Sequence, residues 1–185
     1  MTKEDILEPT LEDHGIFMLT DEITTTNTSS AIEFILKQNF KTKKGRINHL
    51  TLIINSMGGD LNSAFALIDV MRGSKIPIHT VGLGQISSAG LLIFMTGAKG
   101  NRTITPNTSI LSHQYSTGSY GKEHELLAII KEFKLAGERL TSHYMKCTGM
   151  KEKEVREILM PASDIYLDAK EAIKYNIADR IAYLT

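Results

Sequence analysis

Two glycine-bearing turns in this sequence contain residues whose types and spacing could support acyl transfer. One turn, residues 82–90 (GLGQISSAG), places Ser88 among small residues at a predicted strand-to-helix junction. A serine there can expose its hydroxyl where backbone N–H groups converge, as a nucleophile does, or it can simply cap the helix. The other turn, residues 54–60 (INSMGGD), carries paired glycines before a helix. Its backbone N–H groups could form half of an oxyanion hole, although such turns are also common as plain chain reversals.

A histidine and an aspartate further along the chain could act together with that serine. His113 ends an apolar stretch, where a strand could present it toward a cleft as a general base or hold it in an ordinary polar contact. Asp164 lies in a short connection between two predicted helices, where it could orient an imidazole or cap a turn. Serine, histidine and aspartate supply a nucleophile, a base and an orienting group wherever a fold brings them together.

The elements that must position these residues follow from the apolar pattern. Short runs that are apolar on both faces are typical of strands in a parallel sheet covered by helices. Because such runs alternate with helical patterns, we expect an α/β fold in a single domain, residues 1–185. The predicted strands cover residues 15–20, 50–54, 76–81 and 177–183, and the predicted helices cover residues 27–39, 61–71, 123–146, 150–159 and 168–173.

Composition narrows the possible function classes. The chain has 185 residues, and its 21 Lys and Arg balance its 21 Asp and Glu, which argues against a nucleic-acid binder. A single cysteine, Cys147, excludes an internal disulfide framework. The sequence has neither metal-ligand spacing of its histidines nor a G-x-x-x-x-G-K-[ST] phosphate loop, so we expect no metal and no nucleotide cofactor. No signal or membrane-spanning segment is visible, and we expect a cytoplasmic protein with no membrane partner.

Five segments, taken in order, resemble motifs of the ClpP family, the proteolytic subunits of the ATP-dependent Clp protease. The resemblance covers nearly the whole chain, from about Gly15 to Tyr183. The segments are 54–59 (INSMGG, like INSPGG), 84–90 (GQISSAG, like GQAASMG), 109–114 (SILSHQ, like the MIHQ segment), 163–169 (SDIYLDA, like RDxFxSA) and 171–179 (EAIKYNIAD, like EAxxYGLID).

The resemblance implies a serine endopeptidase and gives each candidate residue a role. Ser88 fills the nucleophile's place, His113 that of the general base and then general acid, and Asp164 that of the group that orients the imidazole. The backbone N–H groups of Gly58 and Ala89 would form the oxyanion hole. A backbone donor survives the change from the family's methionine to Ala89.

The resemblance also implies an architecture and partners. The fold would be a crotonase-type α/β core with a strand–helix handle at about residues 114–146 and an N-terminal axial segment at residues 1–14. The strand of that handle would follow His113. Subunits of the family form a homo-oligomer, a heptameric ring that can stack into a tetradecamer around a closed chamber. A hexameric AAA+ unfoldase such as ClpX or ClpA feeds unfolded protein or peptide into it.

Several departures mark a divergent member, and other functions remain open. Met57 replaces a proline, Ser163 replaces an arginine of the ring–ring contact, and Ile53 stands where a docking-pocket tyrosine is common. Residues 115–118 (YSTG) replace PLGG. The alternatives are a phage-type capsid maturation protease, a noncatalytic regulatory ring subunit, and a crotonase-like enzyme acting on an acyl-CoA.

Overall fold

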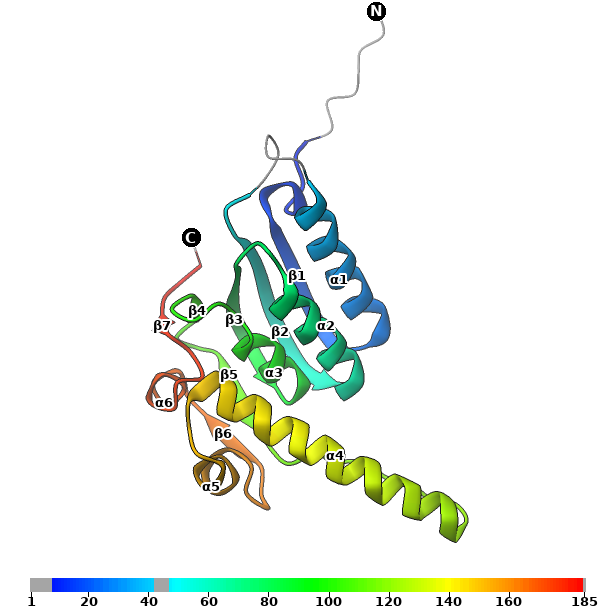
Figure 1. The fold of residues 1–185 in the computed structure, drawn as a ribbon. Helices are drawn as coiled ribbons and strands as arrows, with labels where there is room; N and C mark the ends of the chain where they lie inside the picture. The colour runs from blue at the N-terminus through cyan, green and yellow to red at the C-terminus, as the bar shows by residue number, and fades with distance from the viewer. Residues whose placement is uncertain (1–7, 42–46, 185) are drawn as a thin grey trace, which may run out of the picture.

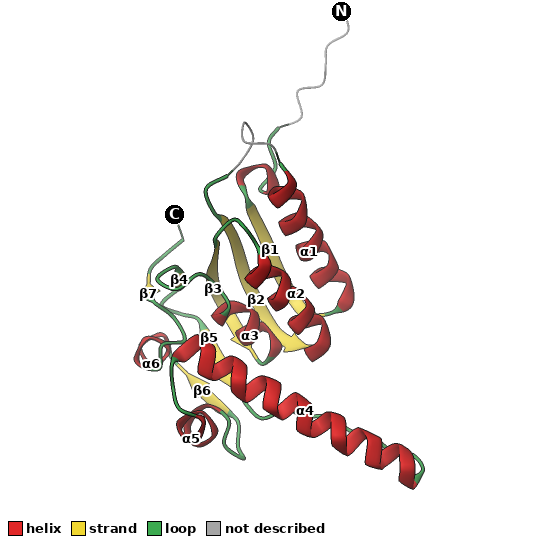
Figure 2. Ribbon diagram, viewed as in Figure 1, coloured by secondary structure: helices red, strands yellow, loops and turns green. Residues whose placement is uncertain are grey.

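A mostly parallel sheet forms the centre of the molecule, as the alternating pattern predicts (Figures 1 and 2). The computed structural model describes residues 8–41 and 47–184, so residues 1–7 of the expected axial segment lie outside the described part. Strands along the main path of the sheet run in the order β1-β2-β3-β4-β7, all parallel. Their bounds are β1 Ile16–Ile23, β2 Leu50–Gly59, β3 Ile78–Ser87, β4 Arg102–Ile104 and β7 Arg180–Ile181.

Three helices pack against one side of this sheet: α1 (Thr25–Phe40), α2 (Leu61–Gly73) and α3 (Ala89–Met95) (Figure 1). Side chains facing them, such as those of Leu19 and Leu52, are fully buried. On the other side of β1, Met18 remains 47% exposed. The helices therefore cover one face of this strand, rather than both faces as its apolar run suggests.

The second part of the fold is built around β5 (Ser109–Ser112) and β6 (Ile165–Leu167). Neither is among the four predicted strands, although β5 coincides with the apolar stretch that His113 was expected to end. β5 pairs parallel with β3 and antiparallel with β6. Asp164 therefore directly precedes a strand, rather than lying between two helices. The chain between β5 and β6 contains the long helix α4 (Glu123–Thr148), the single turn α5 (Glu152–Glu154) and a π-helical turn, Val155–Leu159. This turn and α5 replace the one helix expected over residues 150–159.

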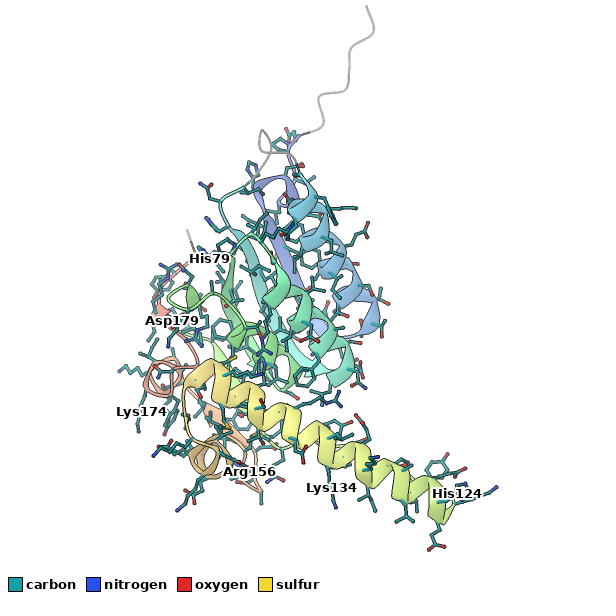
Figure 3. The ribbon with its side chains drawn as sticks, in the orientation of Figure 1. His79, His124, Lys134, Arg156, Lys174 and Asp179 are labelled. Atoms are coloured by element: carbon teal, nitrogen blue, oxygen red, sulfur yellow. The ribbon has the colours of Figure 1, made fainter. Side chains whose placement is uncertain are left out.

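Helix α4 is anchored at one end only. Its buried residues begin at Ala136, and the first half extends away from the sheet, as the positions of His124 and Lys134 show (Figure 3). Residues 113–122 run beside it without forming the predicted handle strand, although Tyr115 packs its ring on Phe133. A strand needs a ladder partner for its N–H and C=O groups. The β5–β6 ladder ends at Ser112 and Ile165, and no described segment continues it.

The C-terminal part of the chain is fixed by a cap and an ion pair. Helix α6 (Ala169–Lys174) begins at Asp168, whose carboxylate accepts the N–H groups of Lys170 and Glu171, so the predicted helix and its cap are confirmed. The buried Arg102 guanidinium donates to both carboxylate oxygens of Asp179, at 2.9 and 2.6 Å; Figure 3 labels Asp179. Strand β7, which follows, is shorter than the predicted 177–183. Within the described ranges, no helix has the length and apolar character needed to span a membrane.

Candidate active site

Ser88 occupies a strained position at the junction of β3 and α3. Its φ of 51° and ψ of −122° are rarely adopted by a residue with a side chain, and such strain concentrates at functional sites. Its N–H donates to the carbonyl of Leu111 on β5 at 2.9 Å, which helps to hold the conformation. Its hydroxyl makes no capping hydrogen bond to α3. The structure therefore does not support the simple helix-cap explanation for this serine.

Gly58 lies directly against Ser88. A Cβ atom on Gly58 would be 2.6 Å from the Cβ of Ser88 and 3.2 Å from the backbone nitrogen of Ala89. The φ of Gly58, 101°, also favours glycine. The two backbone segments expected to form the oxyanion hole are thus brought together by the β2–α2 turn and the start of α3.

The two N–H groups of this expected oxyanion hole differ in what they bind. Ala89 is the first residue of α3, where an N–H has no acceptor within the helix. The N–H of Gly58 instead donates to the Ser56 hydroxyl at 3.1 Å, and that hydroxyl donates to the carbonyl of Asp21 at 2.5 Å. Gly58 must exchange this internal acceptor for a substrate oxygen before both amides can bind one oxyanion.

His113 lines the same pocket as Ser88. The pairing of Ser87 with Leu111 brings the ends of β3 and β5 together, and the residue after β5 then faces a cavity of about 80 Å³. The half-buried imidazole places Nδ1 2.5 Å from the carbonyl oxygen of Gln114. A carbonyl can only accept, so Nδ1 carries the proton and Nε2 is free to act as a base.

Asp164 is adjacent to His113 in the register of the β5–β6 ladder, but the two side chains form no hydrogen bond. Ser112 pairs with Ile165, so the next pair of the antiparallel ladder would be His113 and Asp164. The carboxylate is exposed, and within residues 8–41 and 47–184 no hydrogen bond joins it to His113, or His113 to Ser88. Ser88 and His113 thus line one cavity, Asp164 is next to His113 only in the register of the ladder, and the carbonyl of Gln114 is the acceptor at Nδ1 of His113.

Several pocket residues could not be found from their types alone. The cavity walls include the apolar side chains of Leu61, Leu92 and Leu140, together with Tyr144. The only sequence signal was the spacing of Leu140 and Tyr144, four residues apart on one helix face. Their contribution to a pocket depends on where α4 packs against α3, which the sequence does not show.

A buried histidine supports α3 from behind. The Nε2 of His143 donates to the Leu92 carbonyl at 2.9 Å, and its Nδ1 accepts from the Arg72 guanidinium at 2.9 Å. Burial, and then the positive charge of Arg72, lower the pKa of His143 from 6.5 to about 4. The neutral ring therefore links α4 and α2 to α3, the helix that follows Ser88.

This arrangement predicts a loss of stability in mild acid. Between pH 6.5 and 4 the unfolded chain binds a proton at His143 and the folded chain does not, so the free energy of unfolding falls as the pH falls. The difference between the two pKa values corresponds to roughly 3 kcal/mol. The fall in the free energy of unfolding is measured by urea unfolding at pH 7.0 and 4.5. His143→Gln, whose amide can make both contacts, should flatten the dependence, and the exposed control His124→Gln should not. Equal slopes in all three proteins would contradict the assignment.

Comparison with known proteins agrees with this geometry. The family model described as Clp protease matches residues 2–184. The ATP-dependent Clp protease proteolytic subunit 2 of Treponema denticola is 32% identical over 131 residues, which are 71% of this chain and 64% of that protein. The ATP-dependent Clp protease proteolytic subunit of Deinococcus radiodurans is 29% identical over 178 residues, or 96% of this chain and 84% of that protein.

These matches confirm the predicted resemblance, the α/β fold class and the serine-type peptidase class at the level of the family. They do not favour a capsid maturation protease, a noncatalytic ring subunit or an acyl-CoA enzyme. Ring assembly and association with Clp ATPases are typical of the family. With the match covering 183 of 185 positions, this chain belongs to the Clp protease family.

Proposed function

We propose that this chain is a serine endopeptidase that hydrolyses peptide bonds through Ser88, His113 and Asp164. The observation that carries the proposal is the strained Ser88, which faces the same cavity as His113 and lies against Gly58. A nucleophile on a strand-to-helix turn, a base within one pocket and two convergent backbone amides are what acyl transfer requires.

The reaction follows from these positions. The Ser88 hydroxyl attacks the substrate carbonyl carbon while Nε2 of His113 takes its proton. The N–H of Ala89, joined by that of Gly58, binds the oxyanion, and His113 then protonates the leaving amine. Water, deprotonated by the same imidazole, releases the acyl group from Ser88. The apolar walls of the cavity favour an apolar side chain next to the bond that is cleaved.

Closing of the His113–Asp164 pair completes the site in this proposal. The Nδ1–H now donated to Gln114 would turn to the carboxylate of Asp164, its neighbour in the ladder. Residues 113–122 have no strand partner among residues 8–41 and 47–184. A second subunit or a bound peptide can supply that partner by adding a strand, and this would order the segment that holds His113.

The assembly we propose is a heptameric ring, which can stack into a tetradecamer, with Ser88 facing a closed chamber. Support comes from family membership and from the first half of α4, which extends away from the sheet. Residues 114–146 are the proposed handle. Leu127, Ile130 and Phe133 recur along that half at helical spacing and are 60%, 51% and 38% exposed. Contiguous exposed apolar side chains of this kind are typical of protein–protein contacts.

We also propose an ATP-dependent partner that unfolds the substrate and delivers it to the ring. Both relatives are named as proteolytic subunits of an ATP-dependent protease, whereas this sequence has no phosphate-binding loop. We therefore propose that a hexameric unfoldase of the ClpX or ClpA type delivers unfolded protein to the chamber in the cytoplasm.

Labelling with a fluorophosphonate probe tests the proposal. The full-length chain should gain one adduct by intact mass, and peptide mapping should place the adduct on Ser88. Both Ser88→Ala and His113→Ala should lose it, because the first removes the nucleophile and the second removes its base. A folded, oligomeric sample that gains no adduct, or gains one elsewhere, would contradict the proposed function.

A further inference from the structure

Three buried polar groups adjoin the cavity that Ser88 and His113 line, and one of them belongs to Tyr144, which lines it too. The Tyr144 hydroxyl on α4 is 2.6 Å from the hydroxyl of Ser112, the last residue of β5. The Ser112 hydroxyl is 2.5 Å from the carbonyl oxygen of Leu159, at the end of the π-helical turn. Ser112 and Leu159 are fully buried and Tyr144 is 1% exposed, so no solvent competes for these bonds.

The direction of each hydrogen bond is fixed by the donors available. A carbonyl can only accept, so the single Ser112 proton goes to Leu159. The Tyr144 hydroxyl must then donate to Ser112. Burial raises the pKa of Tyr144 to about 12, which keeps the phenol protonated as a donor at neutral pH. The three groups form one satisfied chain, Tyr144 to Ser112 to Leu159.

Hydrogen bonds hold the backbone on both sides of His113, the expected base. Ser112 precedes His113 and bonds the carbonyl of Leu159, while the side-chain amide of Gln114 donates to the next carbonyl, that of Met160, at 3.0 Å. The position of His113 is thus tied to consecutive residues at the start of the segment that leads to Asp164. Tyr144 adds α4 to the same junction, and it also lines the cavity.

We propose that Tyr144 and Ser112 are positioning residues that set His113 in register with Ser88 and Asp164 during peptide-bond hydrolysis. The inference rests on the proposed function, because it assigns these two residues a part in that reaction. Neither touches a reacting atom in this role. A displacement of about 1 Å at a reacting group can cost on the order of a hundredfold in rate, so a hydroxyl one residue away from the base can matter for chemistry.

The experiment compares Tyr144→Phe and Ser112→Ala with Thr141→Val in the full-length chain. Thr141 is a matched control because it is buried on the same helix, is 3% exposed, and its hydroxyl donates to the Gly137 carbonyl of its own helix. The measurements are the rate constant for fluorophosphonate labelling of Ser88, its dependence on pH, and the melting temperature.

We expect Tyr144→Phe and Ser112→Ala to slow labelling about 10- to 100-fold and to move the pH midpoint of the rate. The double variant should be no slower than the slower single variant, because both substitutions break one chain. Thr141→Val should lower the melting temperature by a similar amount and label within about twofold of the parent. A purely structural role would lower melting temperatures without changing the rate or its pH midpoint.

The outcomes separate this inference from the proposed function. If the parent labels at Ser88 and Tyr144→Phe labels equally fast with the same pH midpoint, the positioning role is wrong and the proposed function stands. If the parent itself does not label, the proposed function fails and this inference fails with it. Should Ser112→Ala not fold, Tyr144→Phe, which removes one oxygen atom, still decides between the two.

Discussion

Replacing Ser88 by alanine should lower the turnover of a fluorogenic peptide by about a millionfold, because loss of the nucleophile abolishes the acyl intermediate. The remaining rate would come from binding and backbone amides alone. Folding should be unaffected, since the Ser88 hydroxyl makes no capping bond and alanine meets the same backbone strain. The measurements are kcat for a fluorogenic peptide that has an apolar residue before the scissile bond, and the thermal unfolding of both proteins.

The neighbouring serine provides the control. Ser87 is fully buried and accepts a hydrogen bond from the Gln85 amide at 2.9 Å, without lining the cavity. Ser87→Ala should therefore keep kcat within about tenfold of the parent, since a single neutral hydrogen bond is worth about 1 kcal/mol. A Ser88→Ala protein that still cleaves at a tenth of the parent rate would assign the nucleophile elsewhere.

Substituting Gly58 by alanine should disable the site by a different route. The new Cβ would lie 2.6 Å from the Cβ of Ser88 and 2.9 Å from the Ser87 carbonyl oxygen, at a φ of 101°. Backbone cannot yield to this contact without moving Ser88 and the Gly58 amide together. Loss of one oxyanion donor typically costs about 10²- to 10³-fold in kcat, and displacement of the nucleophile adds to it. Labelling rate and kcat should therefore both fall by at least that factor.

Gly137→Ala is the matched control for this variant. Gly137 lies inside α4 with open space where its Cβ would be, and alanine in a helix interior is more stable than glycine by roughly 0.5–1 kcal/mol. It should melt slightly higher than the parent and keep the parent kcat. If Gly58→Ala also kept the parent kcat, the turn at Gly58 could not be part of the oxyanion hole.

Apolar patterning was enough to predict the larger elements. Helices α1, α2 and α4 begin and end within two residues of the predicted bounds, because each has a strong cap or a continuous apolar stripe. The three-residue strand β6 was missed, since its sequence, Ile165–Leu167, is too short to show a period. The predicted handle strand is absent because strand formation depends on a partner, which no local pattern reveals.

The candidate site was predicted only in part. Residue types and family motifs brought out Ser88, His113 and Asp164, but spacing could not show that β5 would pair with β3 and bring the first two together. Neither could it show the Gln114 carbonyl at Nδ1 of His113. The Tyr144–Ser112 contact spans 32 residues and joins two polar groups, each unremarkable in its own segment. Its only sequence signal was a serine at the end of an otherwise apolar run.

The helix that follows Ser88 is shielded along its whole length: every residue of α3, Ala89–Met95, is buried. The strained serine, which lines the cavity, is therefore joined directly to a helix that belongs to the hydrophobic core. Unfolding of this core would release the strained backbone of Ser88, so we expect loss of the core and loss of the candidate site to coincide. For a serine protease of the Clp type, this coupling would prevent a partly unfolded subunit from cleaving proteins.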